Sequence, residues 1–209
     1  MAEEKKSGKF FSLNLGVNGG TFTPSTKGDV EINYTDGSQV KGNQGYKFEY
    51  GIYSMFADAE FTFEGYTTMI ELGYANAELD EWVYVNDIHD QYIKFDETKF
   101  DQNIHVFSGM IFAGPIIFPK KRFQIPLLVG FGTKYYSGEP FDKLTIEFGY
   151  KARAKFYFSN RVGIFGGASG YWGFAGPKYF GDKKQYSATP VIHKFVYEAG
   201  LTIMLGRLK

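Results

Sequence analysis

Hydrophobic and polar residues alternate along the segment 143–158, which reads "KLTIEFGYKARAKFYF". Its even positions carry no charge, whereas its odd positions include Lys151, Arg153 and Lys155. Alternation with a period of two is typical of a β-strand whose two faces have different surroundings. The segment therefore predicts a long strand with one apolar face and one face that holds three cations in a row.

The same alternation recurs along the chain, and no stretch has the pattern of an amphipathic helix. The predicted strands are 11–18, 57–63, 70–75, 104–113, 123–135, 143–158, 161–174 and 194–206. In the fourth of them the apolar face is assigned to the even positions, from Ile104 to Phe112, although Phe107 and Ile111 blur the pattern. The chain is therefore predicted to be all-β with eight strands.

The connections between these strands differ in length. They are tight after the second, fourth and sixth strands, where the sequence reads "EG", "PKKR" and "SN". The other connections are polar and mostly longer, at 23–45, 85–102, 137–142 and 176–190. An antiparallel up-and-down sheet with this alternation has two unequal ends. Transmembrane β-barrels of bacteria have that asymmetry, with short periplasmic turns and long outer loops.

Aromatic residues gather at two levels along the predicted strands. One set brackets the tight turns and a second set, which includes Tyr50, lies farther along the strands. The residues of these two predicted girdles are Phe61, Phe63, Tyr66, Phe118, Phe123 and Phe158, and then Tyr74, Tyr135, Tyr150 and Trp172. The distance from Phe123 to Tyr135 is about 40 Å along a strand at ~3.3 Å per residue. At a tilt of ~40° it spans roughly 30 Å, close to the apolar thickness of a bilayer.

Composition supports an all-β chain and excludes several kinds of chemistry. Aromatic residues make up 19% of the chain, and 26 Gly stand against 7 Pro. The absence of Cys excludes disulfides, thiol nucleophiles and thiolate metal sites. The 23 basic residues balance the 23 acidic ones, and no nucleic-acid partner is expected. No apolar window is long enough for a transmembrane helix, and the mean hydropathy of −0.27 suits strands that are apolar on one face only.

The chain is predicted to hold one domain. Residues 1–8 are expected to form a flexible N-terminal tail, and residues 9–209 a single β-barrel domain. The start "MAEEKKSGKF" has no apolar core and is not a signal peptide. We favour a mature chain with a Met added in front, located in the bacterial outer membrane, over a cytosolic chain.

Alternation alone also fits a soluble, lipocalin-like β-barrel that binds an apolar ligand inside and turns its charges to water. Three features favour the membrane. The polar face is rich in Gly, Ser and Ala, as expected where side chains converge in a narrow barrel. The apolar face has few gaps and ends in aromatic residues, and the chain lacks the short helix that soluble barrels of this kind commonly carry.

The layout of nearly the whole chain resembles the small eight-stranded outer-membrane barrels of the OmpA transmembrane domain, OmpX and OmpW type. The segment "KARAKFYFSNRVGIFGGASGYW" is similar to the paired late strands of such barrels. The last strand looks like the sorting signal read by the outer-membrane assembly machinery, in the residues Glu198, Gly200, Leu201, Ile203 and Leu205. The family commonly ends on an aromatic residue, whereas this chain continues as "GRLK". The resemblance implies outer-membrane lipids and the assembly machinery as partners, with host or environmental ligands at the outer loops.

If the apolar face meets lipid, the cations of 143–158 point into the barrel, where they need acidic partners. The predicted lumen network comprises Asp58, Glu60, Glu71, Glu147, Lys151, Arg153, Lys155, Lys194 and Glu198. The interior of an eight-stranded barrel is only wide enough for side chains to fill. A closed, salt-bridged lumen is therefore expected, and a charged permeation path is the alternative.

Candidate catalytic chemistry is sparse. None of His89, His105 and His193 lies in a His-x-Ser arrangement. The acidic residues of 85–102 lack the Asp-x-Asp-x-Gly spacing of a calcium loop, so neither a metal nor another cofactor is expected. The sequence predicts a non-enzymatic barrel that binds or adheres through its outer loops, or that passes small hydrophobic molecules.

Overall fold

The computed structural model describes residues 9–33, 35–86, 91–94, 103–119, 122–138, 143–174 and 191–207. Its strands are β1 (Phe10–Asn33), β2 (Gln39–Phe63), β3 (Tyr66–Asn86), β4 (Gln91–Lys94), β5 (Asn103–Ile117), β6 (Phe123–Ser137), β7 (Lys143–Tyr157), β8 (Val162–Phe174) and β9 (Val191–Arg207). Within these ranges, no helix has the length and the apolar character that a membrane crossing requires. The predicted tail, residues 1–8, lies outside the described residues.

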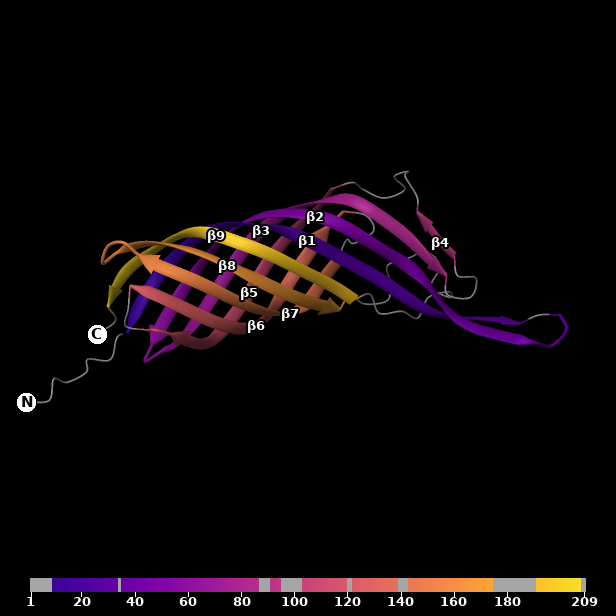
Figure 1. Ribbon diagram of the computed structural model, residues 1–209, viewed down its shortest axis with the longest axis horizontal. Coiled ribbons are helices and arrows are strands. Elements are labelled where there is room, and N and C mark those ends of the chain that lie inside the picture. Colours follow the sequence, from indigo (N-terminus) through magenta and orange to yellow (C-terminus); the bar gives the residue numbers. More distant parts are fainter. Residues whose placement is uncertain are drawn as a thin grey trace, which may run out of the picture.

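Eight of the strands close into a barrel. Each pairs with its neighbours in an antiparallel direction, in the order β1-β2-β3-β5-β6-β7-β8-β9, and β9 returns to β1 (Figure 1). This confirms the predicted all-β, eight-stranded, up-and-down arrangement. The short strand β4 was not predicted. It lies in the segment assigned to a long loop and pairs only with the far end of β3.

The tight connections and both termini lie at one end of the barrel, here called the turn end; the opposite end is the loop end (Figure 1). Glu64 and Gly65 both have positive φ, 46° and 91°. A two-residue hairpin loop needs that conformation because its twist then matches the twist of the strands. Backbone bonds tie the turns to neighbouring strands, for example from Ile116 N to Gly65 O at 2.7 Å.

The hairpin of β1 and β2 extends beyond the barrel at the loop end (Figure 1). Their pairing continues to Asn33↔Gln39, whereas the pairing of β1 with β9 stops at Ser25. The prediction of a loop over 23–45 was therefore wrong, because a ladder of backbone hydrogen bonds forms strands here without a continuous apolar face. Asp36 closes the turn by accepting bonds from Ser38 N at 2.9 Å and Ser38 Oγ at 2.6 Å. These bonds lower the pKa of Asp36 below its usual value.

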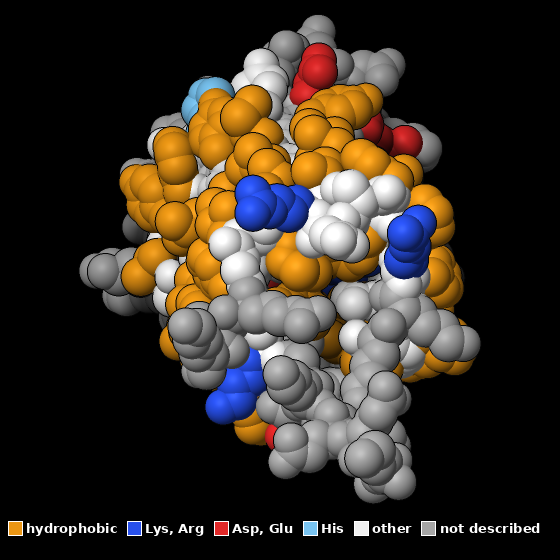
Figure 2. Space-filling model, turned by 90° about the vertical axis from the view of Figure 1, so that its left-hand side faces the viewer, with side chains coloured by type: hydrophobic (Ala, Val, Ile, Leu, Met, Phe, Trp, Pro, Cys, Tyr) orange, Lys and Arg blue, Asp and Glu red, His pale blue; other side chains and the backbone are white. Residues whose placement is uncertain are grey.

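The large apolar side chains of the strands point outward. Seen from the turn end, hydrophobic side chains cover the upper part and the sides of the barrel (Figure 2). On β7, Leu144, Ile146 and Phe148 are exposed, whereas Thr145 and Glu147 between them are buried in the lumen. The apolar face of the opening pattern is thus the outer face of the barrel.

The faces of β5 are the reverse of the prediction. The even positions Ile104 and Phe112 are buried inside the barrel, and Phe107 and Ile111 are exposed outside it. Both faces of this strand are apolar, so the alternation cannot identify the inner one. The pairing with β3 decides the phase, because Met110 stands opposite the inward Glu71.

An apolar cluster fills the lumen toward the loop end. This apolar lid comprises Phe22, Phe48, Tyr50, Ile52, Ala75, Ala77, Ile104, Val106, Tyr136 and Val196. At its centre the ring of Phe22 stacks on Tyr136, with 5.3 Å between centroids, and lies 5.4 Å from the ring of Tyr50. The placement of Tyr50 in an outer girdle was therefore wrong, since its side chain is fully buried.

Candidate functional site

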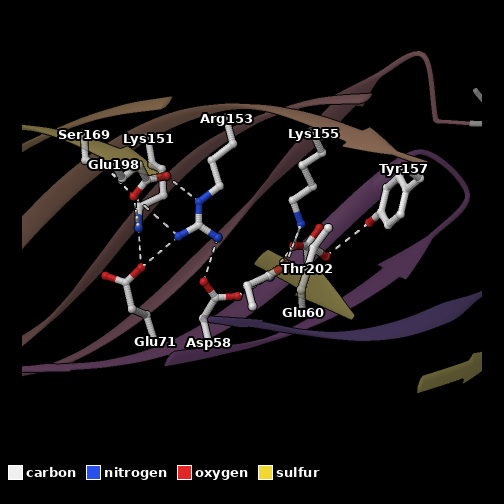
Figure 3. A network of polar contacts seen from close by, with 11 residues as sticks. Asp58, Glu60, Glu71, Lys151, Arg153, Lys155, Tyr157, Ser169, Glu198 and Thr202 are labelled. Atoms are coloured by element: carbon white, nitrogen blue, oxygen red, sulfur yellow. Dashed lines mark hydrogen bonds and ion pairs between the residues drawn. The ribbon is translucent and has the colours of Figure 1, made fainter. Parts of the chain in front are cut away.

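The lumen below the apolar lid is lined by charged side chains from facing strands. Lys151, Arg153 and Lys155 are two residues apart on β7, so all three point inward and lie one after another along the barrel. Acidic side chains from β2, β3 and β9 converge on them (Figure 3). Burial of this kind is tolerated only when each charge is paired and hydrogen-bonded, because removing an ion from water costs several kcal/mol.

Arg153 is the centre of the largest cluster. Its Nη1 donates to Asp58 Oδ2 at 2.6 Å, its Nη2 to Glu71 Oε2 at 3.2 Å, and its Nε to Glu198 Oε1 (Figure 3). Lys151 Nζ pairs with Glu71 and lies 3.1 Å from Glu198 Oε2. Two cations are therefore paired with three carboxylates.

A second pair lies nearer the turn end. Lys155 Nζ pairs with Glu60 and lies 3.4 Å from Asn14 Oδ1. The amide of Asn14 donates to Glu60 Oε2 at 3.1 Å and also to Asp58, and so joins this pair to the cluster around Arg153. Asn14 was not among the predicted site residues. Its signal is its position in the inward phase of β1, directly opposite Asp58 in the register.

A third pair lies nearer the loop end. Lys134 Nζ lies 2.6 Å from Glu147 Oε2, which comes from the neighbouring strand, and 3.5 Å from the centroid of the Tyr171 ring. Tyr136 of the apolar lid donates its hydroxyl hydrogen to Glu147 Oε1. Lys134 was absent from the predicted network, although it occupies the polar phase of β6. Its partner follows only from the register that places β6 beside β7.

Lys194 differs from the other lumen cations. It is 8% exposed, and its Nζ lies 5.5 Å from the centroid of Tyr171. Within the part of the chain that the structure describes, no carboxylate lies within 4.0 Å of it. Eight of the nine residues predicted for the lumen network thus form ion pairs with one another or with Lys134, and Lys194 does not.

The residues predicted for the two girdles and for the assembly signal face outward, except Glu198 and Gly200, which lie in the inward phase of β9. All ten girdle residues have exposed side chains, and so do Leu201, Ile203 and Leu205 of the last strand. The carboxylate of Glu198 belongs to the ion cluster in the lumen. Recognition of the last strand by an assembly machinery stays a prediction.

The residues that the structure describes form no metal centre. They include no group of three His, Cys, Asp or Glu side chains that could hold a metal ion. His105 is exposed on β5, and its Nδ1 lies 2.9 Å from Tyr74 Oη. His89 and the acidic residues Asp87, Asp90, Asp96 and Asp101 lie outside the described residues, as does the side chain of His193.

Between the ion pairs and the apolar lid the lumen holds a small cavity. It leaves about 10 Å³ for the centre of a water-sized sphere, enough for one such sphere. A much larger groove, of about 920 Å³, lies on the outer face and is lined by outward residues such as Leu15, Met55 and Leu72. A further space, of about 140 Å³, borders the buried side chains of Tyr171 and Lys194.

Comparison with known proteins gives likeness of fold only. No family model and no curated protein sequence matches the chain. Neisserial surface protein A is 10% identical, over 90% of this chain and 96% of that chain, with a TM-score of 0.49. The outer membrane protease OmpT from Escherichia coli is 11% identical, over 93% and 97%, with a TM-score of 0.43. The beta domain of the Bordetella autotransporter BrkA is 8% identical, over 94% and 98%, with a TM-score of 0.31. Because these identities and TM-scores are low, the likenesses carry no argument about this chain. The barrel is assigned from its own strand pairings.

Proposed function

We propose that the protein is an integral outer-membrane β-barrel with a closed lumen, not an enzyme, whose binding functions lie at the loop end. One observation carries this proposal: the polarity of the barrel is inverted relative to a soluble one. Large apolar side chains cover the outside, and ten charged side chains, five acidic and five basic, are buried inside. A lipocalin-like barrel would place its apolar face around an internal ligand and its charges in water.

The spacing of the exposed aromatic residues supports a bilayer as the surroundings. Phe123 and Tyr135 on β6 are both exposed, and apolar side chains such as Val129 and Phe131 are exposed between them. Twelve residues of tilted strand cover roughly 30 Å, the thickness of the hydrocarbon layer. In water, a belt of this size would be a site of aggregation.

The two ends of the barrel suggest its orientation. Short turns face the periplasm in bacterial barrels, which places the turn end and both termini on that side. The loop end, with the projecting hairpin of β1 and β2, then faces outward and presents polar strands to external ligands. Lipids and the assembly machinery are the partners proposed for the wall and the last strand.

Closure of the lumen disfavours transport through it. The ion pairs around Arg153 and the apolar lid lie one above the other, and the cavity between them leaves only about 10 Å³ for the centre of a water-sized sphere. Small hydrophobic molecules would need to break both layers to pass along the barrel axis. Binding at the loop end is therefore the function that we prefer.

We expect little steady ion conductance when the protein is reconstituted in planar bilayers, because the lumen charges neutralise one another without water-filled space. Neutralising two partners together, in Arg153→Gln with Glu198→Gln, should loosen the packing and raise the conductance while lowering stability. Lys47→Gln, in the exposed part of β2, is the matched control and should change neither quantity. A stable, open, nanosiemens-scale channel in the unmodified protein would contradict a closed lumen.

A further inference from the structure

The ten lumen charges balance in total but not locally. Lys155 with Glu60 is neutral, and the cluster of Lys151 and Arg153 with three carboxylates carries one negative charge in excess. Nearer the loop end, Lys134 and Lys194 share the single carboxylate of Glu147, which leaves one positive charge in excess. A buried ammonium group in this position either has a counterion or a strong set of dipoles, or it releases its proton and stays as the neutral amine.

The excess positive charge borders the lumen cavity. Lys134 and Lys194 both line it, together with the uncharged polar side chains of Asn18, Ser54 and Ser108. Lys194 is more than nine-tenths buried, and no hydrogen bond or ion pair joins its Nζ to another described residue. The cavity thus combines an unpaired ammonium group with several hydroxyl and amide donors.

The polar groups on the cavity wall can serve as donors. Ser54 Oγ donates to Asn18 Oδ1, which occupies the acceptor of that amide and leaves its NH₂ group to donate elsewhere. One carboxylate, that of Glu71, also lines the cavity. Its Oε2 pairs with Lys151 and with Arg153 at 3.2 Å, two cations that Glu71 shares with Asp58 and Glu198.

We infer that this cavity binds one small monovalent anion of halide size, with Lys194 as its principal charge partner. The space for a single small sphere excludes phosphate, sulfate and carboxylate ligands with apolar tails. An anion there would pair with the ammonium group of Lys194 and accept hydrogen bonds from Lys194, Lys134 and Asn18. A water molecule could accept the same bonds, but it would leave Lys194 without an ion-pair partner.

The test is urea unfolding in neutral detergent micelles at constant ionic strength, with sodium bromide replacing sodium gluconate. Gluconate is too large for the cavity. Once the bromide concentration exceeds the dissociation constant of the site, each further tenfold rise in bromide should raise the ratio of folded to unfolded protein about tenfold. Crystals soaked in bromide should show one anomalous peak inside the barrel, beside Lys194.

Three variants separate this site from general effects of salt. Lys194→Met removes the charge, and Gly73→Ala fills the cavity, since its Cβ would lie 2.7 Å from Ser108 Oγ. Both should lose the bromide response, and Gly73→Ala still tests the site if Lys194→Met does not fold. Lys47→Met, on an exposed lysine, should keep the response. If the stability of the unmodified protein did not change when bromide replaced gluconate, the cavity would hold water only. A bromide response that survived in both cavity variants would lead to the same conclusion.

Discussion

Replacing Arg153 by Met should destabilise the barrel by about 3–5 kcal/mol, the cost of removing one partner from a buried ion cluster. Arg153 is 1% exposed and contacts three carboxylates, those of Asp58, Glu71 and Glu198. Without its guanidinium, Lys151 would remain beside Glu71 and Glu198, and Asp58 would lose its ion pair. Two uncompensated negative charges would then remain in a space that water cannot fill.

Urea unfolding in detergent micelles measures this loss. The double replacement Asp58→Asn with Glu198→Gln, added to Arg153→Met, removes the two excess charges and should recover a large part of the stability. Lys47→Met is the control for loss of a cation outside the lumen. A loss below about 1 kcal/mol for Arg153→Met, the size expected of an exposed ion pair, would show that the cluster is hydrated.

Placing a charge on the outer face should have the second largest effect. Val129 lies at the middle of β6 and is 69% exposed, so an arginine there would enter the centre of the bilayer. We expect Val129→Arg to cost about 2–4 kcal/mol in lipid vesicles, where no water solvates the guanidinium. The free energy of unfolding in urea checks this value.

A second position with similar exposure provides the control for Val129→Arg. Leu144 is 66% exposed, but it is the second residue of β7 and lies at the loop end, near the membrane surface. Leu144→Arg should cost about 0–1 kcal/mol, because charged groups near the interface reach water. If the two variants lost the same small amount, the outer face would not be in contact with lipid.

The faces of the strands could be predicted where one face is polar and the other apolar. On β7 the charges at odd positions distinguish the lumen from the outer face, and the structure agrees. On β5 the rule fails because Ile104 and Val106 belong to the apolar lid while Phe107 and Ile111 face outward. A period of two shows that two faces exist, and it identifies the inner face only when their polarities differ.

The composition of the lumen could be predicted more fully than its contacts. The sequence places acids and bases in the inward phase of several strands, but it does not give the pairs. Arg153 and Asp58 are 95 residues apart, and Tyr136 and Glu147 are 11 apart. These contacts depend on the register and on which strands face each other across the barrel. Asn14 and Lys134 were missed for the same reason.

The most direct test of a membrane-spanning barrel is an accessibility scan of β6 in lipid bilayers. The chain has no Cys, so single spin-labelled cysteines can replace the residues from Phe123 to Tyr135 one at a time. We expect high oxygen accessibility at the outward positions Leu127, Val129 and Phe131 and low values at the inward positions between them. A water-soluble nickel chelate should reach outward labels only near the strand ends. If the chelate reached Val129 as freely as Phe123 and Tyr135, β6 would face water, and the protein would not be an integral membrane barrel.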